Sequence, residues 1–125
     1  MISEGDILLF QFPQSDLRTG KLRTALLIKK IEGNFDDWLV CMISTQTRHQ
    51  IQGLEVVLHD TMADFTQTGL KKESLIRVSR LAVVDSNVFT GKLGSLPPET
   101  FENIKIRLAN WIRSEESIQT NLDNA

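Results

Sequence analysis

The run Asp6-Ile7-Leu8-Leu9-Phe10-Gln11-Phe12, which ends at Pro13, is the clearest structural signal in this chain of 125 residues. It is apolar, too short for a helix and bounded by breakers, so it predicts a buried β-strand. Residues 13–20 are rich in turn formers and predict a loop. Residues 22–30 (LRTALLIKK) predict a second strand, which the turn at Glu32-Gly33-Asn34 closes.

Further short strands are predicted along the chain. The β-branched and aromatic content of residues 38–43 favours a strand over a short helix, and residues 54–58 predict another. Residues 76–81 alternate apolar and polar, which is typical of a half-buried strand with Arg77, Ser79 and Arg80 near one surface. This strand continues to residue 84. We expect a helical turn near residues 61–65 and a short strand at 88–92.

A single helix is predicted near the C-terminal end. Pro98 suits the first helical position, and Glu99 suits the positive end of the helix dipole. Large apolar residues recur at three- and four-residue steps and predict one buried face: Phe101, Ile104, Leu108, Trp111 and Ile112. Short strands with one such helix predict a mainly β (α+β) fold, a small closed or half-open β-barrel with the C-terminal helix packed on it. We expect one domain at residues 1–114 and a frayed polar tail at 115–125.

Composition indicates the compartment and excludes several chemistries. Cys41 is the only cysteine, so the chain forms no internal disulfide, and its apolar neighbours predict a core residue. No apolar run approaches the ~18 residues of a membrane span, and the acidic N-terminus lacks the basic region of a secretory signal. His49 and His59 fall into no metal-binding spacing, so we expect surface histidines and neither metal nor cofactor. A cytoplasmic protein without membrane contact is expected.

The charge is unevenly distributed. The net charge of −2 by itself argues against nucleic acid as a partner. However, residues 1–17 carry three acids and no base, and residues 93–125 carry five acids and three bases. Residues 18–92 carry eleven bases and eight acids. The middle of the chain is therefore mildly basic between acidic ends.

One constellation of polar residues lies in that basic middle. It comprises Arg18, Lys21 and Arg23, then Ser44, Thr45 and Gln46, and finally Arg77 and Arg80. Spacing alone leaves two interpretations open: solvated residues at the edge of a barrel, or a site that carries chemistry. Ser44 lacks the Gly-x-Ser-x-Gly context of a serine hydrolase. Trp38 opens a strand and belongs to the core or its rim, while Trp111 falls on the core face of the helix.

Four motifs in order resemble the MazF/PemK-like toxin family over about residues 4–113. The first is residues 5–13 (GDILLFQFP) followed by 20–28 (GKLRTALLI). The second is Ile43-Ser44-Thr45-Gln46, a strand that ends in hydroxyl residues. The third is residues 69–78 (GLKKESLIRV), and the last is residues 91–94 (GKLG) before the Pro98 helix.

The resemblance implies a homodimeric SH3-like barrel. It also implies a metal-independent endoribonuclease that cuts single-stranded RNA at short sequences, and an antitoxin protein that neutralises it. Arg23 stands at the family's catalytic arginine, and Ser44 and Thr45 flank its catalytic hydroxyl position. Two residues depart from the pattern. Thr24 replaces a proline, and Ser79 stands where some relatives place an acid, which puts a mechanism with that acid as base in doubt.

Metal-free RNA cleavage uses the RNA's own 2′-hydroxyl, which attacks the adjacent phosphate. We expect Arg23 to stabilise charge on the phosphate, and Ser44 or Thr45 to hydrogen-bond a phosphate oxygen or to help orient the attacking hydroxyl. His49 is a candidate acid or base. The expected RNA contacts are Arg18, Lys21, Gln46, Arg48, His49, Lys71, Lys72, Arg77 and Arg80. Phe65 and Trp38 are the best candidates for base stacking.

Two other functions stay open at this point. The first is a non-catalytic barrel that retains antitoxin or nucleic-acid binding without cleavage, as the departures at Thr24 and Ser79 suggest. The second is a family member that acts on another target. If an antitoxin exists, we expect its segment to cover Arg23, Ser44 and Arg77, and to be acidic and partly disordered before binding.

Overall fold

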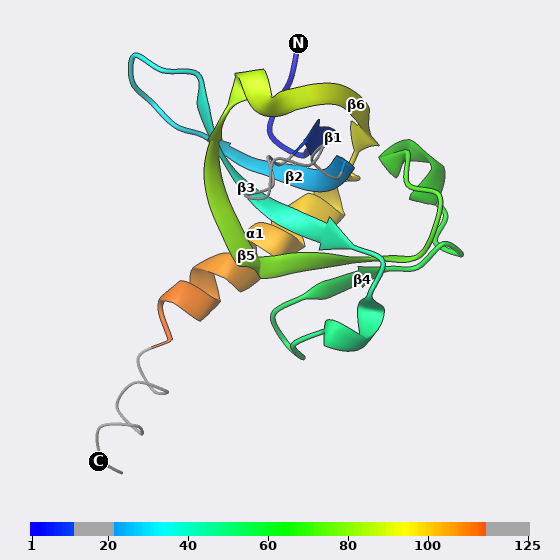
Figure 1. The fold of residues 1–125 in the computed structure, drawn as a ribbon. Helices are drawn as coiled ribbons and strands as arrows, with labels where there is room; N and C mark the ends of the chain where they lie inside the picture. The colour runs from blue at the N-terminus through cyan, green and yellow to red at the C-terminus, as the bar shows by residue number, and fades with distance from the viewer. Residues whose placement is uncertain (12–21, 115–125) are drawn as a thin grey trace, which may run out of the picture.

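The computed structural model describes residues 1–11 and 22–114 (Figure 1). In these residues one antiparallel sheet is followed by one α-helix, as expected for a mainly β fold. The strands are β1 (Asp6–Gln11), β2 (Leu22–Lys30), β3 (Asp37–Ser44), β4 (Val56–Leu58), β5 (Ser74–Asp85) and β6 (Phe89–Ser95), and the helix is α1 (Pro98–Ile112). Three short 3-10 turns join them: η1 (Thr47–His49), η2 (Phe65–Thr68) and η3 (Ser86–Val88).

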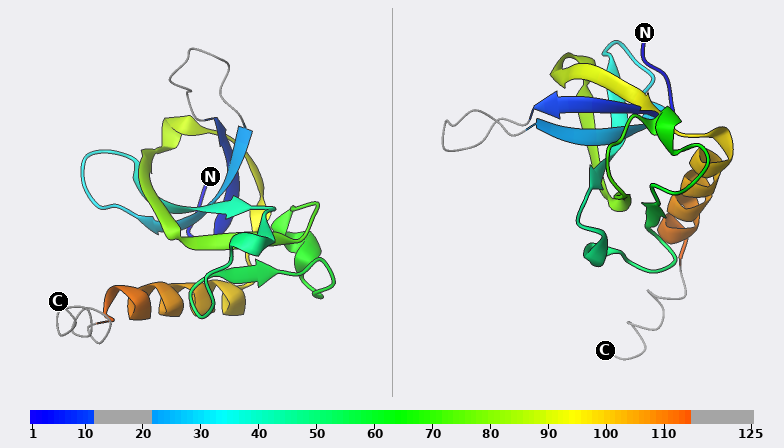
Figure 2. Two further views of the ribbon diagram at one scale, coloured as in Figure 1. Left: turned by 60° about the horizontal axis from the view of Figure 1, so that its bottom comes forward. Right: turned by 90° about the vertical axis from the view of Figure 1, so that its right-hand side faces the viewer.

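The strands lie in the order β4-β5-β3-β2-β1-β6. The sheet curls strongly on itself, and α1 lies across one side of the curl (Figure 2). Strands β4 and β6 are the two edges and are not paired with each other, so the barrel is half-open. None of the described helices is long and apolar enough to cross a membrane.

Both faces of the sheet are covered, which explains the near-continuous apolar runs of β1 and β2. Ile7 and Leu26 belong to the cluster that includes Ile104 and Leu108 of α1. Their sequence neighbours Leu8 and Leu27 belong to a second cluster with Trp38. Because successive side chains of a strand point to opposite faces, a strand between two cores needs apolar residues at every position.

The two tryptophans occupy different environments. Trp38 is buried in the second cluster, and its indole N–H donates to a carboxylate oxygen of Asp36 at 3.0 Å. Trp38 is therefore a core residue, and its expected role in base stacking is wrong. The placement of Trp111 and Ile112 on the core face is also wrong, because they are 45% and 67% exposed. The core cluster along α1 ends at Leu108.

Local boundaries differ from the sequence prediction at two turns. The helical turn expected near residues 61–65 is η2, which begins only at Phe65. Val88 closes the turn η3 rather than opening a strand, because the Asp85 side chain accepts a hydrogen bond from the Asn87 backbone N–H at 2.8 Å and starts that turn. Strand β6 then runs from Phe89 to Ser95, three residues further than expected.

Two glycines let η2 pack against β6. Gly69 has φ +72°, and a side chain there would collide with the Leu93 carbonyl oxygen. A side chain at Gly94 would collide with the backbone of Gln67 and Thr68. This close backbone contact fixes the start of the segment that carries Lys71 and Lys72.

Candidate active site

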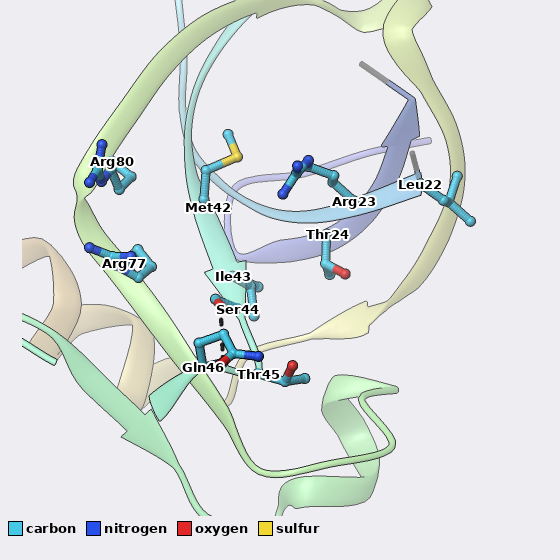
Figure 3. A pocket seen from close by; sticks show the side chains of 10 residues that line it. All are labelled: Leu22, Arg23, Thr24, Met42, Ile43, Ser44, Thr45, Gln46, Arg77 and Arg80. Atoms are coloured by element: carbon cyan, nitrogen blue, oxygen red, sulfur yellow. Dashed lines mark hydrogen bonds between the residues drawn. The ribbon is translucent and has the colours of Figure 1, made fainter. Parts of the chain in front are cut away.

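A hollow of about 430 Å³ opens where β2 begins and β3 ends, beside the middle of β5 (Figure 3). Strand β3 lies between β2 and β5 in the sheet, so Arg23 approaches from one side and Arg77 and Arg80 from the other. The residues that line the hollow are Leu22, Arg23, Thr24, Met42, Ile43, Ser44, Thr45, Gln46, Arg77 and Arg80. The structure thus brings together six of the residues that the sequence nominated.

An irregularity in β5 gives the hollow its second arginine. In a regular strand, residues three apart point to opposite faces. Between the pairs Met42↔Arg77 and Cys41↔Leu81, however, β3 advances by one residue while β5 advances by four. The extra residues bend β5, as bulges do. Both Arg77 and Arg80 therefore line the same hollow.

The hydroxyl residues lie where two hollows meet. Strand β3 ends at Ser44, whose Oγ accepts a hydrogen bond from the Gln46 backbone N–H at 3.0 Å (Figure 3). Ser44 and Thr45 also line an adjoining hollow of about 420 Å³ that contains Lys71 and Lys72. A chain-like ligand could therefore run from the arginines past the hydroxyls to the lysines.

The first hollow is lined by cations without acids. None of its ten lining residues is Asp, Glu or His. Arg23 and Arg80 form no ion pair with any residue that the structure describes, whereas Arg77 pairs with Glu55 at 3.2 Å between Nε and Oε2. An excess of fixed positive charge in a concave site favours an anion such as a phosphate.

Sequence reasoning missed Glu55, which is fully buried directly behind this hollow. The signal was present as a single acid in the apolar stretch Leu54-Glu55-Val56-Val57-Leu58. Buried carboxylates are rare unless they are paired, so an acid in an apolar stretch points to a partner. Only the fold shows that the partner is Arg77 of β5.

Several nominated residues lie elsewhere. Arg48 and His49 belong to η1, are exposed and line neither of these hollows. His59 is exposed, as expected, and its Nδ1 lies 2.6 Å from a carboxylate oxygen of Glu73. Phe65 packs partly buried against the core. Arg18 and Lys21 lie outside the described residues.

The single cysteine is a core residue, as its neighbours predicted. Cys41 is fully buried in strand β3. Burial, followed by the negative charge of Glu55, raises the pKa of its thiol to about 12. A thiol held in its neutral form is a poor nucleophile. Among residues 1–11 and 22–114, no three His, Cys, Asp or Glu side chains are grouped so as to hold a metal ion.

The fold and the hollow together define a class: a small half-open antiparallel barrel with one C-terminal helix and a basic hollow at its strand ends. Residues 3–112 match the model of the family described as PemK-like, MazF-like toxin of type II toxin-antitoxin system. The chain belongs to this family of toxins.

A solved structure supports the same fold. The Mycobacterium tuberculosis toxin MazF-mt6 superposes with a TM-score of 0.62 at 18% sequence identity, over 84% of this chain and 93% of that one. At this identity the likeness shows the fold alone. The comparison with curated proteins finds no match.

Proposed function

We propose that this toxin is a metal-independent endoribonuclease that cuts single-stranded RNA at short sequences and thereby inhibits translation. The observation that carries the proposal is the convergence of Arg23, Arg77 and Arg80 with two hydroxyl residues in one hollow without acids. Three guanidinium groups around a phosphate supply the electrostatic stabilisation that a phosphorane-like transition state needs.

In the proposed reaction the 2′-oxygen of the RNA attacks the adjacent phosphorus and the bond to the 5′-oxygen breaks. The 2′-hydroxyl loses its proton and the leaving 5′-oxygen gains one, so the products are a 2′,3′-cyclic phosphate and a 5′-hydroxyl. Arg23 stabilises the phosphate charge, and Ser44 or Thr45 orients a phosphate oxygen. Because the lining side chains include no His or carboxylate, they supply orientation and charge rather than an obvious proton acceptor.

Further parts of the proposal concern the surroundings of the site. Residues 1–114 form the domain, which acts as a homodimer in the cytoplasm. A cognate antitoxin with an acidic segment covers the arginine-lined hollow, since opposite charges complement each other there. Lys71 and Lys72 hold phosphates that flank the cut, because they border the adjoining hollow.

The test is incubation of the purified chain with a long RNA in EDTA. Discrete fragments that end in a cyclic phosphate support the proposal, provided that the same preparation of Arg23→Ala gives none at equal concentration. Intact RNA that is nevertheless bound would favour the alternative, a binding module without cleavage. Fragments that also form with Arg23→Ala would indicate a contaminating nuclease. The experiment would then give no support to RNA cleavage by this chain.

A further inference from the structure

Glu55 is an unusual residue because it is a fully buried carboxylate beside the candidate active site. It precedes β4, and three donors converge on its side chain. The Ile51 backbone N–H donates to Oε1 at 3.0 Å, while Arg77 Nε (3.2 Å) and Ser79 Oγ (2.9 Å) donate to Oε2. A buried carboxylate that accepts three hydrogen bonds, one of them from the charged Arg77, is well satisfied.

The backbone around Glu55 is fixed as firmly as its side chain. The backbone N–H groups of Leu54 and Glu55 both donate to the Ile51 carbonyl, and the Gln50 side-chain amide donates to the Glu55 carbonyl at 3.1 Å. The carboxylate is thus held by a closed turn on one side and by β5 on the other. A group with so little freedom can hold a flexible partner in one orientation.

That partner is Arg77, which contacts Glu55 and the hollow at the same time. Glu55 takes the Nε–H edge of the guanidinium, and the two terminal nitrogens have no acceptor among the described residues. Glu55 itself does not line the hollow. It can therefore act on a ligand there only through Arg77.

We propose that Glu55 is a positioning residue that holds the Arg77 guanidinium in the orientation required to grip the RNA phosphate. The inference rests on the proposed endoribonuclease function and adds a residue to it. Ser79, two residues after Arg77 on the same face of β5, completes the arrangement by donating to the same carboxylate oxygen.

Glu55→Gln separates positioning from packing, because glutamine has nearly the same shape. A carboxylate accepts all three hydrogen bonds, whereas an amide has one acceptor oxygen and one donor NH₂ group. Whichever way the amide lies, one donor, Ile51 N–H or Arg77 Nε–H, faces its NH₂ group. The variant also removes a negative charge behind the hollow, so the binding of an anion should not weaken.

The experiment compares cleavage kinetics of the wild type with Glu55→Gln and with the double variant Glu55→Gln/Ser79→Asp. The second change returns a carboxylate next to Arg77, since Ser79 Oγ lies 2.9 Å from the original oxygen. We expect kcat to fall at least tenfold in Glu55→Gln with KM unchanged or lower. The double variant should recover most of that loss.

A spectroscopic measurement accompanies the kinetics. In the wild type, the Arg77 Nε–H should give a slowly exchanging proton resonance, which Glu55→Gln should lose and the double variant should regain. An unchanged kcat in Glu55→Gln overturns the inference. So does a fall in kcat that comes with a higher KM and that the double variant does not rescue, because this pattern indicates a purely structural defect.

The proposed function fails separately from this inference. A wild-type chain that leaves RNA intact overturns the endoribonuclease proposal and the positioning role of Glu55 with it. A wild type that cuts RNA while Glu55→Gln cuts it equally fast overturns the role of Glu55 alone.

Discussion

Cations gather at both ends of strand β2, but their surroundings differ. At the end that begins with Leu22, Arg23 joins Arg77 and Arg80 in a hollow that no acid lines. At the other end, Lys29 lies 3.8 Å from a Glu4 oxygen and Lys30 lies 3.0 Å from an Asp36 oxygen.

The acids account for the difference between the two ends. At the Lys30 end the acids, Glu4 and Asp36, are exposed and form ion pairs with Lys29 and Lys30. The ammonium group of Lys30 also lies 5.7 Å from the centre of the Trp38 ring. At the Arg23 end the acid, Glu55, is buried behind Arg77 and reaches only that arginine. Arg23 and Arg80 have no acidic partner among the described residues, and Arg77 keeps its two terminal nitrogens for an external anion. We therefore expect anion binding at the Arg23 end of the strand and surface stabilisation at the Lys30 end.

The largest expected effect is on catalysis. Arg23→Ala should lower the rate of RNA cleavage about a hundredfold or more, which is the scale of losing one preorganised donor to a transition-state oxyanion. Lys30→Ala, a cation removed from the opposite end of the same strand, should stay within twofold of the wild type. Initial rates on one RNA measure both. Equal losses in the two variants would erase the distinction between the ends.

The next effect concerns stability. Glu55→Ala should lower the free energy of unfolding by about 3 kcal/mol, because it leaves Arg77, Ser79 and the Ile51 N–H without their buried acceptor. Asp36→Ala should shift the urea midpoint less, since Asp36 and its pair with Lys30 are exposed. Urea unfolding measures both variants. A larger shift for Asp36→Ala would contradict the contrast between buried and exposed pairs.

A smaller effect should appear in the salt dependence of binding. A 2′-O-methyl RNA lacks the nucleophile and reports binding alone. Each phosphate contact contributes about 0.7 to the slope of log K against log salt for a single strand. Arg23→Ala/Arg80→Ala should make this slope shallower by that amount for each arginine. Lys29→Ala/Lys30→Ala should leave it unchanged, and fluorescence anisotropy at several salt concentrations distinguishes the two.

The smallest effect should come from Asp36, which lies in the turn between β2 and β3. Hydrogen bonds from Ser86, then Lys30 and Trp38, hold the pKa of Asp36 below its ordinary value of 3.8. Because the folded pKa is lower than the unfolded one, this contribution to stability is present above about pH 4 and is lost as the pH falls. Asp36→Asn should thus differ from the wild type less at pH 3 than at pH 7 in urea unfolding. A difference in the free energy of unfolding that is larger at pH 3 than at pH 7 would contradict this prediction.

Much of the fold was predictable because its signals are local. The bounds of β2 match residues 22–30, and α1 begins at Pro98 as its capping residues indicate. The last helical turn was not predictable in the same way. Trp111 and Ile112 continue the apolar spacing of Ile104 and Leu108, and periodicity cannot tell where the covering surface ends.

The candidate site was predictable only in part. The sequence nominated Arg23, Ser44 and Arg77 through their motifs, and these residues line one hollow. It also nominated Arg48 and His49, which follow Gln46 closely in sequence but lie on η1 away from the lining. Sequence proximity fails there because a single turn redirects the chain within two or three residues.

The sequence by itself determined the strands, the helix and the basic middle segment, because hydrophobic periodicity, capping and charge are written residue by residue. The tertiary structure alone decided which of the described cations lie beside an acidic partner and which do not. Glu55 and Arg77 are 22 residues apart, and the irregular register of β3 and β5 brings Arg80 into the same hollow as Arg77. Burial, strand register and the pairing of distant charges depend on how the whole chain packs, so no local pattern encodes them.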